Sequence, residues 1–259
     1  MSKINDLDMT KWKELTDVWT DSLWIIPQRD NSGAHDGHYH GNFVPQIPHQ
    51  LLTRYTKAGD FVLDPFAGSG TTLIEAQRMG RNSIGIELQP DVAMEAIERI
   101  HSEQKEGIIA DTFVDDSRTF DTNRILDTYE IKNVQFIIYH PPYWDIIKFS
   151  EDANDLSNSK NLEEFIDNFR QVVKNTSAIL EKTYSGDHNQ SSVFGHTGIC
   201  ADVHNHASDE DDPRSGGGCR RYGTDRKKLC PDGRIYATGD PLHRHDLLYE
   251  RADRSRLRL

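Results

Sequence analysis

The feature that most constrains the fold is a short apolar run that stops at an acid, a proline and two glycines. Phe61-Val62-Leu63 predicts a buried strand that leads into Asp64-Pro65. Gly68 and Gly70 then allow a sharp turn and a close approach to a ligand, before a helix predicted over Thr71–Met79. A strand that turns through glycines into a helix is the beginning of a βαβ unit.

The same alternation continues over the first two thirds of the chain. Further strands are predicted over Asn82–Leu88, Gly107–Val114 and Val134–Tyr139, and further helices over Pro90–His101 and Leu162–Lys182. Alternating strands and helices favour a parallel sheet with helices on both faces, so we expect an α/β fold with a Rossmann-like sheet. Ligands of such sheets bind beyond the carboxyl ends of the strands.

The glycine-containing loop differs from two phosphate-binding motifs. A P-loop needs a lysine directly after its last glycine, and here Thr71 follows Gly70. The dinucleotide pattern GxGxxG is also absent, because Gly70 is followed by Thr-Thr-Leu. A plain tight turn remains the structural alternative to a binding loop.

Two acids follow the next strands. Glu87 ends the second strand, 23 positions after Asp64, where a carboxylate can accept hydrogen bonds from both hydroxyls of a ribose. Asp116 follows the third strand and could accept a hydrogen bond from an adenine amino group. The alternatives are an exposed strand-end acid for Glu87 and a helix cap for Asp116.

The stretches VLDPFAGSGTT and IGIEL resemble motifs I and II of the S-adenosylmethionine-dependent methyltransferases that modify exocyclic amino groups of DNA bases. The resemblance implies a Rossmann-like methyltransferase sheet with the cofactor's ribose on Glu87 and its adenine near Asp116. It also implies that the methionine part lies against the first loop. The loop residues concerned are Asp64, Phe66, Ala67, Gly68, Gly70 and Thr71. The segment His40–Pro48 is similar to the family segment that closes over the methionine end.

His140-Pro141-Pro142-Tyr143 lies at the end of the fourth predicted strand, 76 residues after Asp64. It resembles the family's catalytic motif IV, Asp/Asn/Ser-Pro-Pro-Tyr/Phe/Trp. An acceptor at the first position and the carbonyl between the prolines can take hydrogen bonds from the amino group, which frees its lone pair for the methyl group. Tyr143 offers a face on which a flipped-out base can stack.

His140 departs from the family's pattern. A neutral imidazole nitrogen can accept one hydrogen bond and a protonated one cannot, so we expect activity to fall at acidic pH. Serine at this position leans toward cytosine and aspartate toward adenine, and histidine decides neither. Trp144–Ser150 is expected to form the flap after the motif, with Lys148 near DNA or simply on the surface.

The chain after Lys182 matches no family pattern. A further strand is expected there, yet Thr183–Phe194 has no apolar run, so the carboxyl-terminal strands are predicted to be missing or scrambled. A metal site is one alternative, although the spacing of its residues is not a standard zinc pattern. Its candidate ligands are Cys200, His204, His206, Cys219 and Cys230. Another alternative is a reading-frame shift, because the codons of Lys182–Gln190 shifted by one base permit an apolar strand; sequencing the encoding DNA tests it.

Charge and composition exclude several classes of protein. The chain has 259 residues and a net charge of −12, all of it in residues 1–182, so a polybasic nucleic-acid binder is excluded. No apolar run approaches the roughly 18–20 residues of a membrane span, and the amino terminus lacks the apolar core of a signal peptide. We therefore expect a cytoplasmic protein without membrane partners. Three cysteines do not form a disulfide framework.

Together the patterns predict an amino-terminal extension over residues 1–40, an incomplete methyltransferase catalytic domain over 41–182 and an atypical tail over 183–259 that is disordered or frameshifted. The expected function is methyl transfer from S-adenosylmethionine to adenine or cytosine amino groups in double-stranded DNA, with the target base flipped out. A cognate restriction nuclease is a possible partner, and no metal is expected. The alternatives are an RNA amino-methyltransferase and an inactive cofactor-binding remnant. His140 and the atypical tail favour the inactive remnant.

Overall fold

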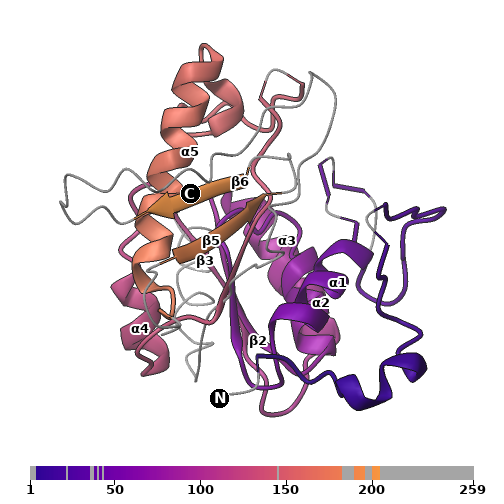
Figure 1. The fold of residues 1–259 in the computed structure, drawn as a ribbon. Coiled ribbons are helices and arrows are strands. Elements are labelled where there is room, and N and C mark those ends of the chain that lie inside the picture. The colour runs from indigo at the N-terminus through magenta and orange to yellow at the C-terminus, as the bar shows by residue number, and fades with distance from the viewer. Residues whose placement is uncertain are drawn as a thin grey trace, which may run out of the picture.

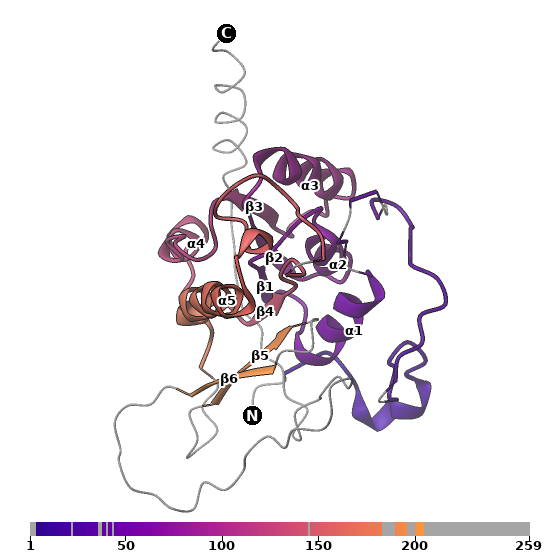
Figure 2. The ribbon, with the colours of Figure 1, turned by 90° about the horizontal axis from the view of Figure 1, so that it is seen from above.

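The computed structural model describes residues 4–21, 23–35, 38–39, 41–42, 44–144, 146–182, 190–195 and 200–204. Its central feature is a six-stranded sheet with helices around it (Figure 1). The strand order is β3-β2-β1-β4-β5-β6 (Figure 2). The first five strands run parallel, and β6 pairs antiparallel with β5. The strands are β1 (Phe61–Asp64), β2 (Asn82–Glu87), β3 (Ala110–Val114), β4 (Phe136–Tyr139), β5 (Gln190–Gly195) and β6 (Cys200–His204).

Helices cover both faces of this sheet. Seen from above, α1, α2 and α3 lie on one side, and α4 and α5 lie on the other (Figure 2). The helices are α1 (Gln46–Tyr55), α2 (Thr71–Arg78), α3 (Pro90–Ser102), α4 (Asn123–Tyr129) and α5 (Leu162–Thr176), with short 3-10 turns η1 (Met9–Glu14), η2 (Leu156–Asn158) and η3 (Ser177–Ile179). The α/β, Rossmann-like prediction is confirmed.

The strand order reverses between β1 and β4, and in sheets of this kind the ligand-binding site lies at such a reversal. The chain moves outward from β1 to β2 and β3, then returns to add β4 on the other side of β1. The connections that leave β1 and β4 therefore diverge, which opens a crevice beyond the carboxyl ends of these two strands. Asp64 and His140 come at these two ends.

The core lies in two layers, one on each face of the sheet. On one face, Phe165, Phe169 and Val172 of α5 pack with Leu63 and Tyr139. On the other, the buried Leu51 and Leu52 of α1 pack with apolar residues of β1 and β4. Burial of a leucine side chain contributes on the order of 1.5–3 kcal/mol, so these layers hold the strand ends in fixed positions.

The helix α1 was not foreseen, because we assigned no secondary structure to His40–Pro48 and Pro48 lies in the third position of the helix. Proline is tolerated in the first turn of a helix, because the N–H groups of that turn make no hydrogen bond within the helix. The helix α4 was also not foreseen. Two predicted strands are shorter than expected, since β3 begins at Ala110 and β4 at Phe136.

The prediction that no strand lies in Thr183–Phe194 is wrong. The strand β5 pairs with β4 through Ile138–Phe194 and Tyr139–Gly195, and β6 continues the sheet. An open edge of a parallel sheet presents unpaired N–H and C=O groups, and pairing satisfies them even where the sequence has no long apolar run. The tail beyond β6 lies outside the described residues. The frameshift hypothesis and the candidate ligands His206, Cys219 and Cys230 therefore remain predictions, as do the domain boundaries.

The amino-terminal segment is tied to the helices by a buried acid on α2. The Glu75 carboxylate lies 2.7 Å from His35 Nε2 and 2.8 Å from His49 Nδ1. Burial raises the pKa of Glu75, but the hydrogen bonds from both histidines outweigh it and lower this pKa to about 2. The ionised carboxylate thus holds His35 against α1 and α2.

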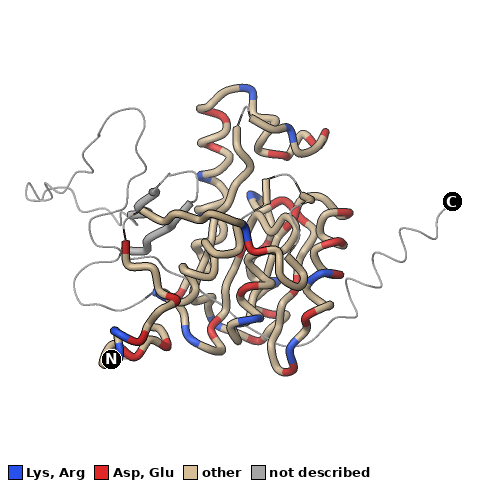
Figure 3. Tube along the Cα trace, turned by 90° about the vertical axis from the view of Figure 1, so that its right-hand side faces the viewer, with Lys and Arg blue, Asp and Glu red and all other residues tan. Residues whose placement is uncertain are grey.

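Across the residues that the structure places, no helix is long and apolar enough to cross a membrane. Lys and Arg are scattered among Asp and Glu along the chain rather than gathered in one stripe (Figure 3).

Candidate active site

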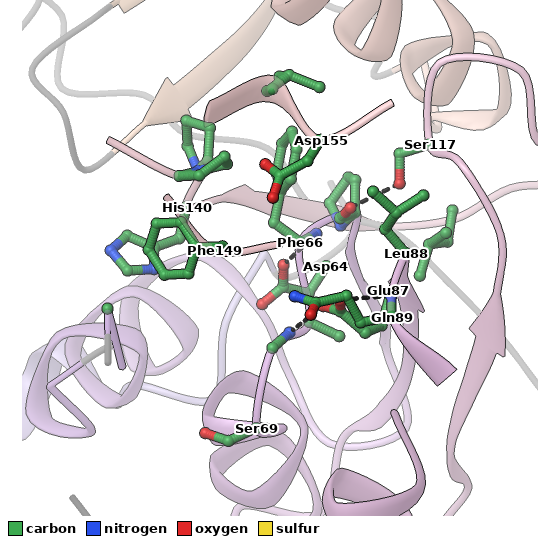
Figure 4. A pocket seen from close by; sticks show the side chains of 18 of the residues that line it. Asp64, Phe66, Ser69, Glu87, Leu88, Gln89, Ser117, His140, Phe149 and Asp155 are labelled. Carbon is green, nitrogen blue, oxygen red and sulfur yellow. Dashed lines mark hydrogen bonds between the residues drawn. The ribbon is translucent and has the colours of Figure 1, made fainter. Parts of the chain in front are cut away.

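A pocket opens beyond the carboxyl ends of β1, β2 and β4 (Figure 4). Eleven of the twelve residues that the sequence singles out for cofactor or catalysis line it. They are Asp64, Phe66, Ala67, Gly68, Thr71, Glu87, Asp116, His140, Pro141, Pro142 and Tyr143. The fold therefore brings the first loop and the Pro-Pro segment to one cavity, although 76 residues separate Asp64 from His140 in the chain.

Two buried acids form the floor of the pocket. Asp64 is 2% exposed and accepts the N–H of Phe66 at 2.9 Å. Burial raises its pKa to about 6. Glu87 accepts the N–H groups of Gly68 and Gln89, each at 2.9 Å, and these bonds join the first loop to the end of β2 (Figure 4).

The pKa of Glu87 is also raised. Burial is the largest cause, and the nearby negative charges of Asp64 and Asp155 add to it, while the two backbone hydrogen bonds oppose the shift. A carboxylate has about four acceptor positions, so Glu87 keeps capacity for hydroxyl donors beside its two backbone donors.

The two glycines of the loop have different roles. Gly68 lines the pocket, and a Cβ added there would lie 3.3 Å from Tyr39 Cε1. Gly70 is the one predicted site residue that does not line it. Its φ of +83° begins α2, and an added Cβ would lie 3.3 Å from both Ala96 and Ile100 of α3. Gly70 therefore permits close packing of two helices rather than ligand contact.

Asp116 lines the pocket, but its carboxylate already has a strong partner. Arg118 binds it with Nη2 at 2.7 Å from Oδ2, and the same guanidinium reaches Asn154 at 2.8 Å and Asn168 at 3.0 Å. An amino group bound at Asp116 would therefore share the carboxylate with Arg118. The arginine also ties this end of the pocket to the loop before η2 and to α5.

The Pro-Pro segment forms the opposite wall. His140 Nε2 lies 3.4 Å from the Tyr143 hydroxyl, with the rings nearly perpendicular. Both side chains are half-buried, and burial raises the pKa of Tyr143, so its hydroxyl stays protonated near neutral pH. Trp144 donates from Nε1 to the Ser159 carbonyl at 3.0 Å and anchors the chain after the motif.

The lining also includes Tyr39, Asn42, Phe149 and Asp155. Asn42 lies in the segment His40–Pro48 and accepts a hydrogen bond from Thr71 Oγ1 at 3.1 Å. Phe149 lies in the expected flap. Tyr39 and Asp155 had no signal in the sequence, because only the tertiary fold brings their loops to the strand ends.

The pocket is strongly acidic. Among the residues that the structure describes, five carboxylates and no lysine or arginine line it; the acids are Asp64, Glu87, Asp115, Asp116 and Asp155. Such a lining suits a ligand with positive charge and hydroxyl groups, and repels a bare phosphate. Among the described residues no group of three or more His, Cys, Asp or Glu could hold a metal ion.

This chain is similar to known DNA methyltransferases over part of its length. Residues 2–98 match the family described as DNA methylase. The Type II methyltransferase M.MjaII of Methanocaldococcus jannaschii is 50% identical over 52 residues, which cover 20% of this chain and 10% of that protein. M2.DpnII of Streptococcus pneumoniae is 36% identical over 109 residues, covering 40% and 35%. M2.LlaDCHI of Lactococcus lactis subsp. cremoris is 36% identical over 93 residues, covering 34% and 31%.

Among solved structures, the crystal structure of TrmN from Thermus thermophilus aligns with 60% of this chain and 39% of that chain, at 19% identity and a TM-score of 0.42. The chain matches about a tenth to a third of the length of the curated relatives named above. The recognised resemblance to DNA amino-methyltransferases is confirmed for the matched residues. The family match ends at residue 98, before Asp116 and the Pro-Pro segment.

Proposed function

We propose that this chain, whose first part matches the DNA methylase family, transfers a methyl group from S-adenosylmethionine to an exocyclic amino group of a DNA base. One observation carries the proposal: the matched loop with Asp64 and Glu87 shares a single pocket with His140-Pro141-Pro142-Tyr143. The acidic lining adds support, because this cofactor carries a net positive charge.

The cofactor half of the pocket binds and orients. Glu87 accepts hydrogen bonds from the ribose hydroxyls, while its bond from Gly68 keeps the first loop in place. Asp64 and the backbone of Phe66–Gly68 face the methionine part, and Asp116 with Arg118 borders the adenine. When bound, S-adenosylmethionine supplies an electrophilic methyl group on a sulfonium ion.

The catalytic half prepares the nucleophile. The Pro141 carbonyl and a neutral His140 nitrogen would each accept one hydrogen bond from the base's amino group, which localises its lone pair on nitrogen. When the new N–C bond forms, the amino group must release one proton, which the neutral His140 nitrogen can accept. Tyr143 stacks on a base that has left the duplex. Pro141 and Pro142 have no N–H to compete for these acceptors and limit the motion of the wall.

The proposed substrate is double-stranded DNA, with adenine or cytosine as target base. An enzyme that modifies cellular DNA works where that DNA is, and on this ground alone we propose a cytoplasmic location. The relatives are named Type II methyltransferases. We extend this to a proposed role in protection from a cognate restriction nuclease.

The decisive experiment is transfer of a radiolabelled methyl group from S-adenosylmethionine to duplex DNA, followed by nucleoside analysis. We expect label in N6-methyladenine or N4-methylcytosine, and none with Glu87→Ala. Label in RNA but not in DNA would favour the RNA-modifying alternative. No label in either substrate, with the cofactor bound, would contradict the proposal.

A second candidate is a cofactor-binding remnant without turnover, which the histidine at position 140 favours. In that case the protein binds S-adenosylmethionine but transfers no methyl group. The variants His140→Asp and His140→Ser would then gain activity, because each restores an oxygen acceptor. Methyl transfer by the unchanged protein would exclude the remnant.

A further inference from the structure

Two aromatic rings from distant parts of the chain meet at the pocket. Tyr39 precedes α1 and Phe149 follows the Pro-Pro segment, and both line the cavity. Their ring centroids are 6.3 Å apart, with an angle of 37° between the ring planes. The pair therefore joins the segment before the cofactor loop to the flap after the catalytic motif.

Each ring lies close to a glycine, in space that a Cβ atom at that glycine would enter. A Cβ at Gly41 would lie 2.6 Å from Phe149 Cε1 and Cζ, and a Cβ at Gly68 would lie 3.3 Å from Tyr39 Cε1. Any side chain at Gly41 would push the Phe149 ring away. Gly68 belongs to the loop that carries Asp64, so the Tyr39 ring lies directly over the proposed methionine end of the cofactor site.

The surroundings of the rings favour positive charge. Burial raises the pKa of Tyr39, and the negative charges of Glu87, Asp155 and Glu95 raise it further, so its hydroxyl remains neutral. Within the described part of the chain, the pocket lining contains no lysine or arginine that would compete for the ring faces. The face of an aromatic ring attracts a cation, most strongly where water is excluded.

We propose that Tyr39 and Phe149 form a two-ring wall that recognises the positively charged sulfur of S-adenosylmethionine. The wall would distinguish this cofactor from S-adenosylhomocysteine, whose sulfur is an uncharged thioether. The inference rests on the proposed function. It adds two specificity-determining residues, and it implies that the product is held less tightly than the cofactor.

Calorimetric titration of the full chain with each of the two compounds tests this inference. In Tyr39→Leu and in Phe149→Leu we expect affinity for S-adenosylmethionine to fall about tenfold, within the range of one cation–ring contact, and affinity for S-adenosylhomocysteine to change less than twofold. Tyr39→Phe keeps the ring and should bind both like the parent. Trp12→Leu, a matched aromatic-to-leucine change at a residue 60% exposed, is the control.

Circular dichroism of each variant separates misfolding from a local effect, and the two leucine variants lie on different segments. Equal losses for both compounds would overturn the inference, since the rings would then only fill space. Unchanged affinity for both would also overturn it. A parent protein that binds neither compound would instead reject the proposed function, and this inference with it.

Discussion

The two walls of the pocket differ in how firmly the protein holds them. On the cofactor side, Asp64 and Glu87 are buried and receive backbone N–H groups from the loop between them. On the catalytic side, His140 and Tyr143 are half-buried and lie 3.4 Å apart. The family match covers the first wall and ends before the second.

If the proposed function holds, this difference predicts that cofactor binding and methyl transfer can be changed separately. Backbone donors and buried acids form the cofactor wall. Under the same proposal the catalytic wall admits a base from outside, which agrees with the half-buried state of its side chains. Changes on the first wall should therefore act on cofactor affinity, and changes on the second on methyl transfer.

The largest expected effect comes from His140→Ala, which should lower methyl transfer without lowering cofactor affinity. His140→Ala removes an acceptor from the amino group, and we expect methyl transfer to fall about 100- to 1,000-fold, the size found when one preorganised polar group is lost. Affinity for S-adenosylmethionine should remain unchanged. Single-turnover kinetics and calorimetry measure the two quantities. A parallel loss of affinity would show that the walls are not independent.

The second effect concerns the cofactor wall. Glu87→Gln replaces a charged acceptor with a neutral one. Its NH2 group would also lie close to the N–H groups of Gly68 and Gln89, which now donate to the Glu87 carboxylate. We expect affinity for S-adenosylmethionine to fall about 10- to 100-fold, because hydrogen bonds to a charged group contribute roughly 1.5–3 kcal/mol. Asp91→Asn changes an exposed acid in the first turn of α3 and is the matched control. Equal effects of both changes would contradict the ribose-binding role.

A smaller effect separates packing from binding within the first loop. Gly70→Ala forces a positive φ on alanine and crowds Ala96 and Ile100, so we expect a loss of about 1–3 kcal/mol in the free energy of unfolding. Gly80 also has a positive φ, but nothing lies within 4 Å of an added Cβ. Gly80→Ala should therefore cost less, and the difference measures the contact between α2 and α3. Urea unfolding gives both values.

The smallest effect is a pH dependence of binding. The pKa of Asp64 is raised to about 6, so its carboxyl is ionised at pH 7.5 and protonated at pH 5. A cationic ligand prefers the ionised form, and we expect affinity for S-adenosylmethionine to fall several-fold as the pH drops through about 6. Glu87, whose pKa is also raised, acts in the same direction. Asp64→Asn should flatten much of this dependence.

Local patterns predicted much of the cofactor half. The run Phe61-Val62-Leu63, the acid after it and the glycines define the strand, the turn and the helix start within ten residues. Glu87 follows because the next strand must end at the same edge of a parallel sheet. These features depend on near neighbours in the chain, where steric and hydrogen-bonding preferences act directly.

Other features could not be predicted from local patterns. Tyr39 and Asp155 lie in loops without periodicity. Contacts between distant residues are made nearby, from Glu75 to His35 and from Arg118 to Asn154. The strand β5 was missed because its partner, the edge of β4, is supplied by a segment about 50 residues away. The N–H and C=O groups at the edge of β4 can pair with an adjoining strand even if that strand contains few apolar residues.

By itself, the sequence determined the α/β alternation, the first loop, the strand-end acids and the Pro-Pro segment, since each follows from the conformational limits of adjacent residues. Only the tertiary structure decided that Gly70 serves helix packing, that Asp116 is paired with Arg118, and that Tyr39 meets Phe149. These outcomes depend on side chains from distant segments competing for the same space and the same charges. That competition is settled when the sheet and its helices pack together.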